Sequence, residues 1–215
     1  MESLKIQTFQ SHTEEGFPVF VEAVILGIAI GILRKGRLSS LGETQFKGLW
    51  LVIIAFLTQI SPIFLARANV LGDQLIYMPF VAMCMMTIVL FMNLDKSGIW
   101  FVIPGAVMNL VAIGMNKFKM PIDFRGLDYA GLTGVVETIQ DGSLMNYINM
   151  ESAAGFSKYL GKFIGMPDFY PFAKVLSIGD ILIMVGIVIL IQGEMKKVFY
   201  RGSGSMVKYS YKSRY

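Results

Sequence analysis

Apolar residues along this chain fall into long unbroken blocks, which polar and charged stretches separate. Five blocks approach the roughly 20 consecutive apolar residues that a helix needs to cross a hydrocarbon core. They cover residues 17–33, 48–66, 75–94, 98–115 and 175–192. The blocks are continuous, without the two-residue alternation of membrane β-strands, so each is predicted to be a helix. The predicted fold class is all-α: a polytopic membrane helix bundle of about five transmembrane helices, forming one domain over residues 1–194.

The longest interruption, residues 116–174, is not uniformly polar, because tyrosine, phenylalanine and lysine interleave with aliphatic residues there. Structureless loops of this length are uncommon in compact proteins. This external segment is therefore predicted to carry short helices that lie at the membrane interface. One of them is expected between Ser152 and Gly165, where apolar residues recur at helical spacing.

Composition and charge support a membrane protein and orient it. Of 215 residues, 54% are hydrophobic and 16% are charged, whereas soluble domains are about a quarter charged. The net charge is +4, and the tail over residues 195–215 is basic and lacks acids. The link between the first two blocks adds four basic residues: Arg34, Lys35, Arg37 and Lys47. Basic segments face the cytoplasm, so the N-terminus is predicted outside and the C-terminus inside. Membrane lipids are the expected partners and nucleic acid is not, since no recognition motif accompanies the charge.

Polar residues inside the apolar blocks mark a candidate site. An Asp, Lys or Arg at mid-membrane costs about 2.5–3.5 kcal/mol on insertion scales. In the predicted topology Glu22, Gln59, Asn109 and Asp180 all lie roughly 7–11 Å below the outer boundary, at 1.5 Å per residue. Ser177 precedes Asp180 by one helical turn. These five residues are predicted to form a polar pocket that binds a small molecule or an amphiphile such as a lipid. The alternative is that they only join helices by hydrogen bonds.

Several kinds of chemistry are excluded by the composition. His12 is the only histidine and lies in the N-terminal tail, so no histidine-based triad or metal site is expected in the membrane. Cys84 is the only cysteine, and no intrachain disulfide can form. The chain also lacks a phosphate loop and a dinucleotide fingerprint. We therefore expect no metal and no cofactor.

Three short elements resemble a known family. They are the basic link Arg34–Leu38, the pair Met120-Pro121 after the fourth block, and Ser177-Ile178-Gly179-Asp180 at the last block. Together they resemble a bacterial family of small five-pass membrane proteins known only as a domain of unknown function. The family usually has paired glycines before Met120, whereas this chain has Lys-Phe-Lys at residues 117–119. The resemblance implies the plasma membrane of a bacterium and brings no established activity.

The last helix has a second, local likeness. An aromatic-rich stretch followed by an Asp at the outer end of the final helix is similar to lipoprotein signal peptidase, which uses two aspartates. The resemblance makes Asp180 the candidate catalytic residue of a membrane-embedded hydrolase. The second aspartate's Asn-x-x-Asp-Arg motif is absent, so Asp123, Asp141 or Glu22 would have to replace it. A structural or partner subunit of a membrane complex is the third interpretation, and the sequence leaves open whether the protein is an enzyme.

Overall fold

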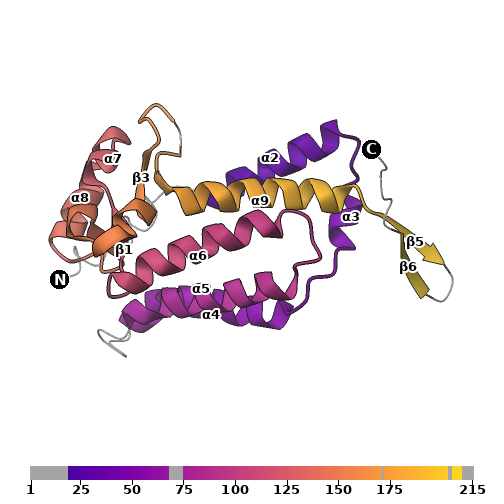
Figure 1. The fold of residues 1–215 in the computed structure, drawn as a ribbon, viewed down its shortest axis with the longest axis horizontal. Coiled ribbons are helices and arrows are strands. Elements are labelled where there is room, and N and C mark those ends of the chain that lie inside the picture. The colour runs from indigo at the N-terminus through magenta and orange to yellow at the C-terminus, as the bar shows by residue number, and fades with distance from the viewer. Residues whose placement is uncertain (1–18, 68–74, 171, 203–204, 210–215) are drawn as a thin grey trace.

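Five apolar helices run side by side along the long axis of the molecule (Figure 1). The computed structural model describes residues 19–67, 75–170, 172–202 and 205–209. The helices are α2 Val19–Leu33, α4 Leu49–Arg67, α5 Tyr77–Met92, α6 Ile99–Met115 and α9 Ile178–Met195. A short helix, α3 Ser39–Gly42, lies in the link between α2 and α4. Each predicted apolar block thus contains a helix.

These helices form an open row, which we call the helical layer. Helix α2 packs against α9, α9 against α6, α6 against α5, and α5 against α4. The contacts use small residues: a Cβ added at Gly27 of α2 would lie 3.0 Å from the Ile191 side chain of α9. Small residues let two helices approach closely. The last helix of the chain is therefore inserted between the first helix and α6.

A four-stranded mixed sheet occupies the segment that was predicted to be an external loop. Its strand order is β2 (Tyr147–Asn149), β1 (Met120–Ile122), β3 (Lys162–Gly165), β4 (Val175–Ser177). Strand β1 is parallel to β2 and β3, and β3 is antiparallel to β4. Two helices, α7 Phe124–Tyr129 and α8 Thr133–Gln140, pack beside the sheet. We call residues 120–177 the α/β unit; it lies at one end of the helical layer (Figure 1).

The α/β unit has a hydrophobic core of its own. Its buried members are Ile122, Leu127, Ala130, Val135, Leu144 and Val175. Helix α7 begins cleanly because Asp123 caps it: the Asp123 carboxylate accepts a hydrogen bond from the Arg125 backbone N–H at 3.0 Å. Strand β4 runs directly into α9, so this small core is joined to the helical layer without a linker.

The predicted interfacial helix at Ser152–Gly165 is replaced by two shorter elements. A 3-10 helix, η3 Gly155–Leu160, is followed by strand β3. Gly161 separates them and packs on β1, where an added Cβ would lie 2.7 Å from the Pro121 carbonyl oxygen. A second 3-10 turn, η2 Met150–Ser152, follows β2. This segment therefore supplies a strand of the sheet instead of one continuous helix, and Phe156, Tyr159 and Phe163 stay exposed.

The expectation of an all-α bundle with five transmembrane helices is wrong, first because of this sheet and second because of helix length. Among the described residues only α9, with 18 residues, is long and apolar enough to cross a membrane. The other helices offer shorter apolar stretches: Phe20–Leu33, Leu49–Pro62 within the 19-residue α4, Tyr77–Met92 and Ile99–Met115. At 1.5 Å per residue, α2 with its 15 residues rises about 22 Å, against a hydrocarbon core of about 30 Å. In two blocks the excess is turn and strand, since residues 93–94 form a turn after α5 and residues 175–177 are β4.

The predicted basic tail contains regular structure. Strand β5 Val198–Gly202 pairs antiparallel with strand β6 Ser205–Tyr209. This hairpin lies at the opposite end of the molecule from the α/β unit (Figure 1).

Candidate functional site

The first turn of α9 is held by a reciprocal pair of hydrogen bonds. Ser177 ends β4 and is the N-cap of α9, and its hydroxyl accepts a bond from the Asp180 backbone N–H at 2.9 Å. The Asp180 carboxylate in turn accepts a bond from the Ser177 backbone N–H at 3.0 Å. This capping box satisfies two backbone donors that a helix start would otherwise leave unpaired. The same residues that carry the family resemblance thus have a local folding role.

Asn109 of α6 closes a ring with these two side chains. Its amide nitrogen donates to Asp180 Oδ1 at 2.8 Å, and its amide oxygen accepts from the Ser177 hydroxyl at 2.9 Å. All three side chains are buried. Both carboxylate oxygens of Asp180 therefore accept a hydrogen bond, and no buried side-chain polar atom of the described residues lacks a partner. A satisfied polar network of this kind fixes one arrangement of α6 against α9.

Two glycines allow this close approach. A Cβ added at Gly179 would lie 2.4 Å from Asn109 Oδ1, and one added at Gly105 would lie 2.4 Å from the Gly179 carbonyl oxygen. Contacts this short are not made by real side chains, so both positions require glycine. The backbones of α6 and α9 therefore meet directly beside the polar ring.

Glu22 lies in a second, neighbouring cluster. It forms an ion pair with Lys174, which stands just before β4, and both side chains are largely buried. Tyr170 completes the cluster: desolvation, together with the charge of Glu22 and a hydrogen bond to it, raises the pKa of the Tyr170 hydroxyl. Lys174 was missed by the sequence prediction because it precedes the last apolar block. The Glu22 carboxylate thus has a counter-charge from the α/β unit.

Gln59 is not brought to either cluster. It lies at an exposed position of α4, which packs on α5 at the far side of the row from α9. The structure therefore joins Asn109, Ser177 and Asp180, places Glu22 beside Lys174, and leaves Gln59 apart. Ligand binding by the five residues stays a prediction.

The acids that would have to act with Asp180 in a two-aspartate hydrolase have local roles. Asp123 caps α7, and Asp141 accepts a hydrogen bond from the Ser143 backbone N–H at 2.8 Å. Backbone and side-chain hydrogen bonds from Ser143 lower the pKa of Asp141. Among the described residues no group of three His, Cys, Asp or Glu side chains could hold a metal ion. Both carboxylate oxygens of Asp180 are used in hydrogen bonds within the protein, to Asn109 and to the Ser177 backbone. This favours a structural role for Asp180 over contact with a substrate.

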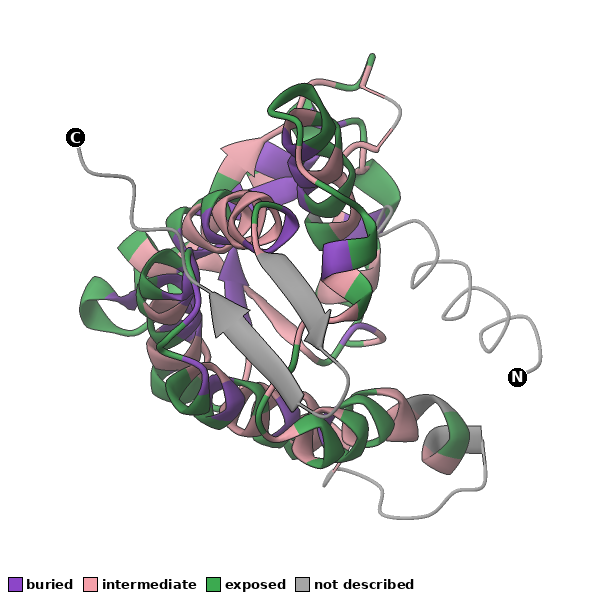
Figure 2. Cartoon of the chain, turned by 90° about the vertical axis from the view of Figure 1, so that its right-hand side faces the viewer, coloured by how far each residue is buried: buried purple, intermediate pink, exposed green. Residues whose placement is uncertain are grey.

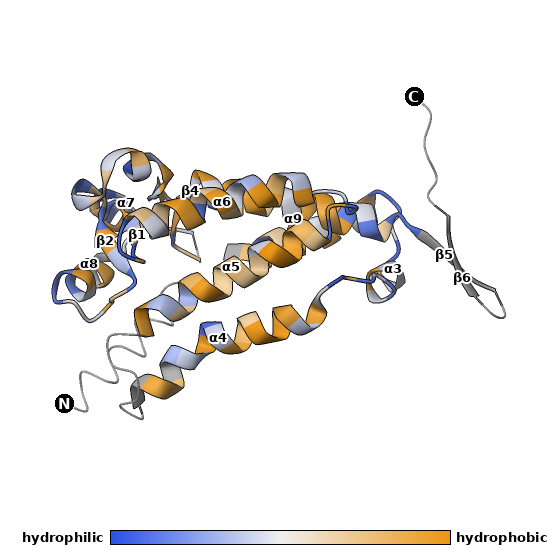
Figure 3. Ribbon diagram, turned by 60° about the horizontal axis from the view of Figure 1, so that its bottom comes forward, coloured by the Kyte–Doolittle hydropathy of each residue, from blue (hydrophilic) through white to orange (hydrophobic). Residues whose placement is uncertain are grey.

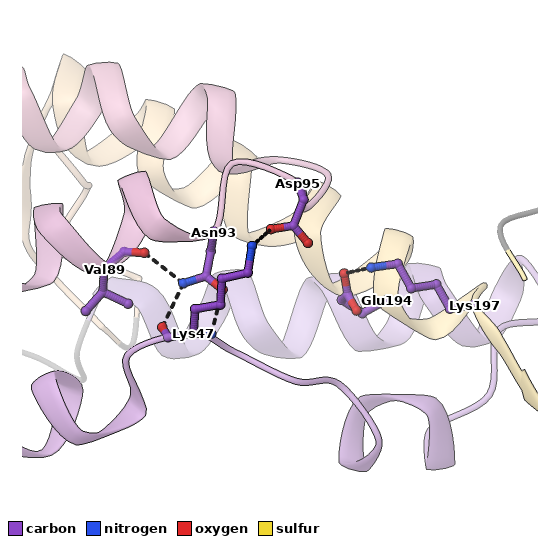
Figure 4. Close-up of polar contacts among 6 residues, drawn as sticks. All are labelled: Lys47, Val89, Asn93, Asp95, Glu194 and Lys197. Carbon is purple, nitrogen blue, oxygen red and sulfur yellow. Dashed lines mark hydrogen bonds and ion pairs between the residues drawn. The ribbon is translucent and has the colours of Figure 1, made fainter. Parts of the chain in front are cut away.

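A further set of polar contacts lies at the opposite end of the helical layer (Figure 4). The Asn93 side chain accepts from the Lys47 backbone N–H and donates to the Lys47 carbonyl, each at 2.9 Å. Lys47 also pairs with Asp95, at 3.3 Å between Nζ and Oδ1. Buried Glu194 forms an ion pair with Lys197. The sequence prediction missed these contacts, which tie the links between helices to α5 and α9.

Comparison with known proteins gives a family and no activity. A family of unknown function, DUF5317, matches residues 43–192, and the chain belongs to this family. The match covers most of the helical layer and the whole α/β unit. No curated protein and no solved structure matches the chain.

Proposed function

We propose that this member of the DUF5317 family is a protein of the plasma membrane that binds a ligand. Its helical layer lies in lipid and holds the α/β unit at the outer surface. One observation supports the membrane location: the helical layer buries small side chains and exposes large apolar ones. Its buried residues include Ala23, Ala55, Ala82, Ala106 and Ala112. Its exposed residues include Ile25, Leu26, Ile53, Phe56, Leu57 and Trp100. Water-soluble proteins usually do the reverse, whereas helices packed in lipid bring small residues together.

The distribution of this surface supports the proposal. In the view of Figure 3 the ribbons of α4 and α5 are mainly hydrophobic, with some hydrophilic positions in α4, and hydrophilic positions are frequent in the links and in the α/β unit. Exposed positions follow the outer sides of the helices in the end-on view (Figure 2). Contiguous apolar surface larger than a few hundred Å² marks an interaction with a membrane or a protein. The large apolar residues that the α/β unit exposes are mainly aromatic, such as Tyr129, Phe156, Tyr159 and Phe169. Aromatic rings favour the membrane interface.

The two ends of helix α9 indicate how the proposed membrane protein is oriented. Its first residue adjoins the α/β unit, and its last residue, Met195, is followed by Lys196 and Lys197. The basic link at residues 34–47 lies at the same end. Basic residues beside a membrane helix favour the cytoplasmic side. In this orientation α9 supplies the crossing, and the shorter helices pack beside it and turn their outer faces to lipid.

A pair of matched lysine substitutions tests the membrane proposal. Ile53 in α4 and Tyr129 in α7 are exposed to nearly the same extent, 60% and 62%. If α4 faces lipid, Ile53→Lys costs about 2–3 kcal/mol and sharply reduces the membrane-inserted protein. Tyr129→Lys should leave insertion unchanged. The measurement is the amount of chain in membranes after alkaline carbonate extraction; equal amounts for both variants, or a wild-type chain extracted by carbonate, would contradict the proposal.

Cysteine labelling tests the orientation. In a Cys84→Ser background, Thr133→Cys in α8 and Ser39→Cys in α3 place single thiols at exposed positions at the two ends of the molecule. A membrane-impermeant maleimide should label position 133 in intact spheroplasts and position 39 only after permeabilisation. The opposite pattern would show that the α/β unit faces the cytoplasm.

The alternative of an aspartate-dependent hydrolase is less well supported. It needs a second carboxylate near Asp180, and the hydrogen bonds around Asp180 come from Asn109 and from the backbone of Ser177. A structural role for the ring formed by Asn109, Ser177 and Asp180 is favoured by its complete hydrogen bonding. We therefore propose that this ring positions the α/β unit, and that binding takes place on that unit.

A further inference from the structure

A cleft of about 360 Å³ opens in the α/β unit beside its edge strand β2. Its apolar walls come from Phe124 of α7, Ile139 of α8, and Tyr147 and Ile148 of β2. The volume falls within the roughly 300–1,000 Å³ typical of small-molecule sites. The sequence prediction did not include any of these residues, and they lie apart from the ring around Asp180.

The polar groups of the cleft are one ammonium and two side-chain amides. They belong to Lys119, Gln140 and Asn149. The Asn149 amide oxygen already accepts a bond from the Glu151 backbone N–H at 3.0 Å, so its NH2 group is the part left to donate. No carboxylate of the described residues lies within ion-pair distance of Lys119. An unpaired ammonium beside amide donors and apolar walls is complementary to an anion with an apolar part.

A second lysine adds positive charge to the aromatic wall. Lys162 lies over the ring of Tyr147, with its Nζ 5.6 Å from the ring centroid. The nearby acid Glu151 has Arg125 as a counter-charge, at 3.9 Å.

We propose that this cleft binds a small amphiphilic anion: a carboxylate or phosphate joined to an apolar group of several carbons. The anionic group contacts Lys119 and the Asn149 amide, and the apolar group lies against Phe124, Ile139 and Tyr147. Lys119 follows the end of α6 at Met115, so the cleft lies close to the end of the helical layer. The ligand can therefore come from solution or from the headgroup of a lipid. Only the lipid source rests on the proposed membrane location.

The test uses the full chain in phosphatidylcholine nanodiscs, labelled with 13C at the isoleucine δ1 methyl groups. Hexyl phosphate is the probe, and hexanol is the uncharged control. The Ile139 and Ile148 methyl signals should shift saturably with hexyl phosphate, while the signal of Ile99, buried in α6, stays in place. Lys119→Gln should weaken binding at least tenfold. Lys117→Gln removes the same charge two residues away, from a side chain that does not line the cleft, and should change the affinity less than twofold.

A second set of nanodiscs distinguishes the two sources. If phosphatidylglycerol shifts the Ile139 and Ile148 signals without hexyl phosphate, and Lys119→Gln abolishes the effect, the ligand is a lipid phosphate. If only hexyl phosphate acts, the ligand is a soluble amphiphile. Absence of saturable shifts with both probes, or equal affinity in Lys119→Gln with an unchanged Ile122 core signal, would overturn the proposal. A chain that stays in solution without lipid would contradict the membrane location alone, and the hexyl phosphate titration would then be run in buffer.

Discussion

The helical layer and the α/β unit use opposite rules for large apolar side chains. In the α/β unit they form the core: Leu127 is 2% exposed and packs with Ile122 and Val175. In the helical layer many of them point outward, and Leu57 of α4 is 55% exposed. Alanine and glycine make many of the contacts within the layer, as at Gly105 and Ala112. One chain therefore contains a part stabilised by burying apolar surface from water and a part whose outer surface suits an apolar solvent.

The contrast explains how the two parts stay together. Burial of apolar area stabilises the α/β core by about 25 cal/mol per Å². That contribution is absent between helices in lipid, where close packing and hydrogen bonds hold helices together. The junction at Asn109, Ser177 and Asp180 uses both of these, since its side chains are fully hydrogen-bonded and its glycines let the backbones touch. Its position at the start of α9 connects the core of the α/β unit to the helical layer.

The comparison is tested most directly by truncating one leucine in each part. Leu127→Ala should destabilise the α/β unit by about 3 kcal/mol, because it leaves a cavity in a small core. Leu57→Ala should change stability by less than about 0.5 kcal/mol, because an exposed side chain leaves no cavity. Hydrogen exchange at the amides of β1 and β3 reports the first effect, and thermal unfolding in detergent reports both. A cost above about 2 kcal/mol for Leu57→Ala would show that α4 is covered by protein and not by lipid.

Exchanging the side chains of Asn109 and Asp180 tests the hydrogen bonding between α6 and α9. Asn109→Asp replaces the donor to Asp180 by a second carboxylate, and leaving a buried carboxylate without its donor beside a like charge costs about 3 kcal/mol. Asp180→Asn costs about 1–2 kcal/mol, since its new NH2 group faces a donor. The double variant Asn109→Asp/Asp180→Asn restores every hydrogen bond with the roles reversed. Its melting temperature in detergent should therefore return to within about 4 °C of wild type, a shift of roughly 1 kcal/mol.

The same double variant separates structure from chemistry at position 180. If the acid at 180 has a catalytic or ligand-binding role, the exchange restores stability but does not rescue the phenotype of a deletion strain. If the ring only positions the α/β unit, the exchange restores both. A double variant less stable than Asn109→Asp alone would contradict the hydrogen-bond assignment.

Smaller losses are expected from the glycine contacts. Gly105→Ala places a Cβ 2.4 Å from the Gly179 carbonyl oxygen, so α6 and α9 must separate, at a cost of about 1–3 kcal/mol. Gly114→Ala on the same helix is the control, since its nearest neighbour, Phe80, would be 3.7 Å away. That variant should be neutral or slightly stabilising. Thermal unfolding in detergent measures both, and equal effects would mean that α6 and α9 are not in direct backbone contact.

The sequence predicted the helices better than the sheet. Continuous apolar blocks determine where α2, α4, α5, α6 and α9 form, because backbone hydrogen bonding inside a helix is local. The strands β1, β2 and β4 have three residues each and pair across long intervals, so no local period reveals them. The prediction of five crossings failed partly because the length of an apolar block is not the length of its helix: the third block has 20 residues, whereas α5 has 16. The sequence analysis singled out the Ser177–Asp180 element and assigned its polar residues to a pocket. In the structure these residues form the capping box that starts α9.

The proximity of some of the five candidate residues was predicted for a related reason, and their binding role stays a prediction. Depth in a membrane is set by position along a helix, so Asn109 and Asp180 could be matched from their spacing. Which helices are neighbours depends on the whole fold, and α4 lies at the far edge of the row, which leaves Gln59 apart. The Lys174 partner of Glu22 and the cleft at Lys119 come from the α/β unit, whose topology the sequence did not reveal.

The smallest expected effect concerns a turn of the α/β unit that is fully exposed to water, where electrostatics are weak. Asp141 ends α8 and accepts the Ser143 N–H, and this hydrogen bonding lowers the pKa of Asp141 below the ordinary value of 3.8. A depressed folded-state pKa means that the contribution to stability is present above the unfolded pKa and is lost as pH falls through the folded value. The Ser143 amide signal should therefore move with a midpoint below pH 3.8. Asp141→Asn keeps an oxygen that can accept the bond and should abolish this titration while leaving the α8 signals in place. A midpoint at or above 3.8 would show that the Asp141–Ser143 hydrogen bond is not populated in solution.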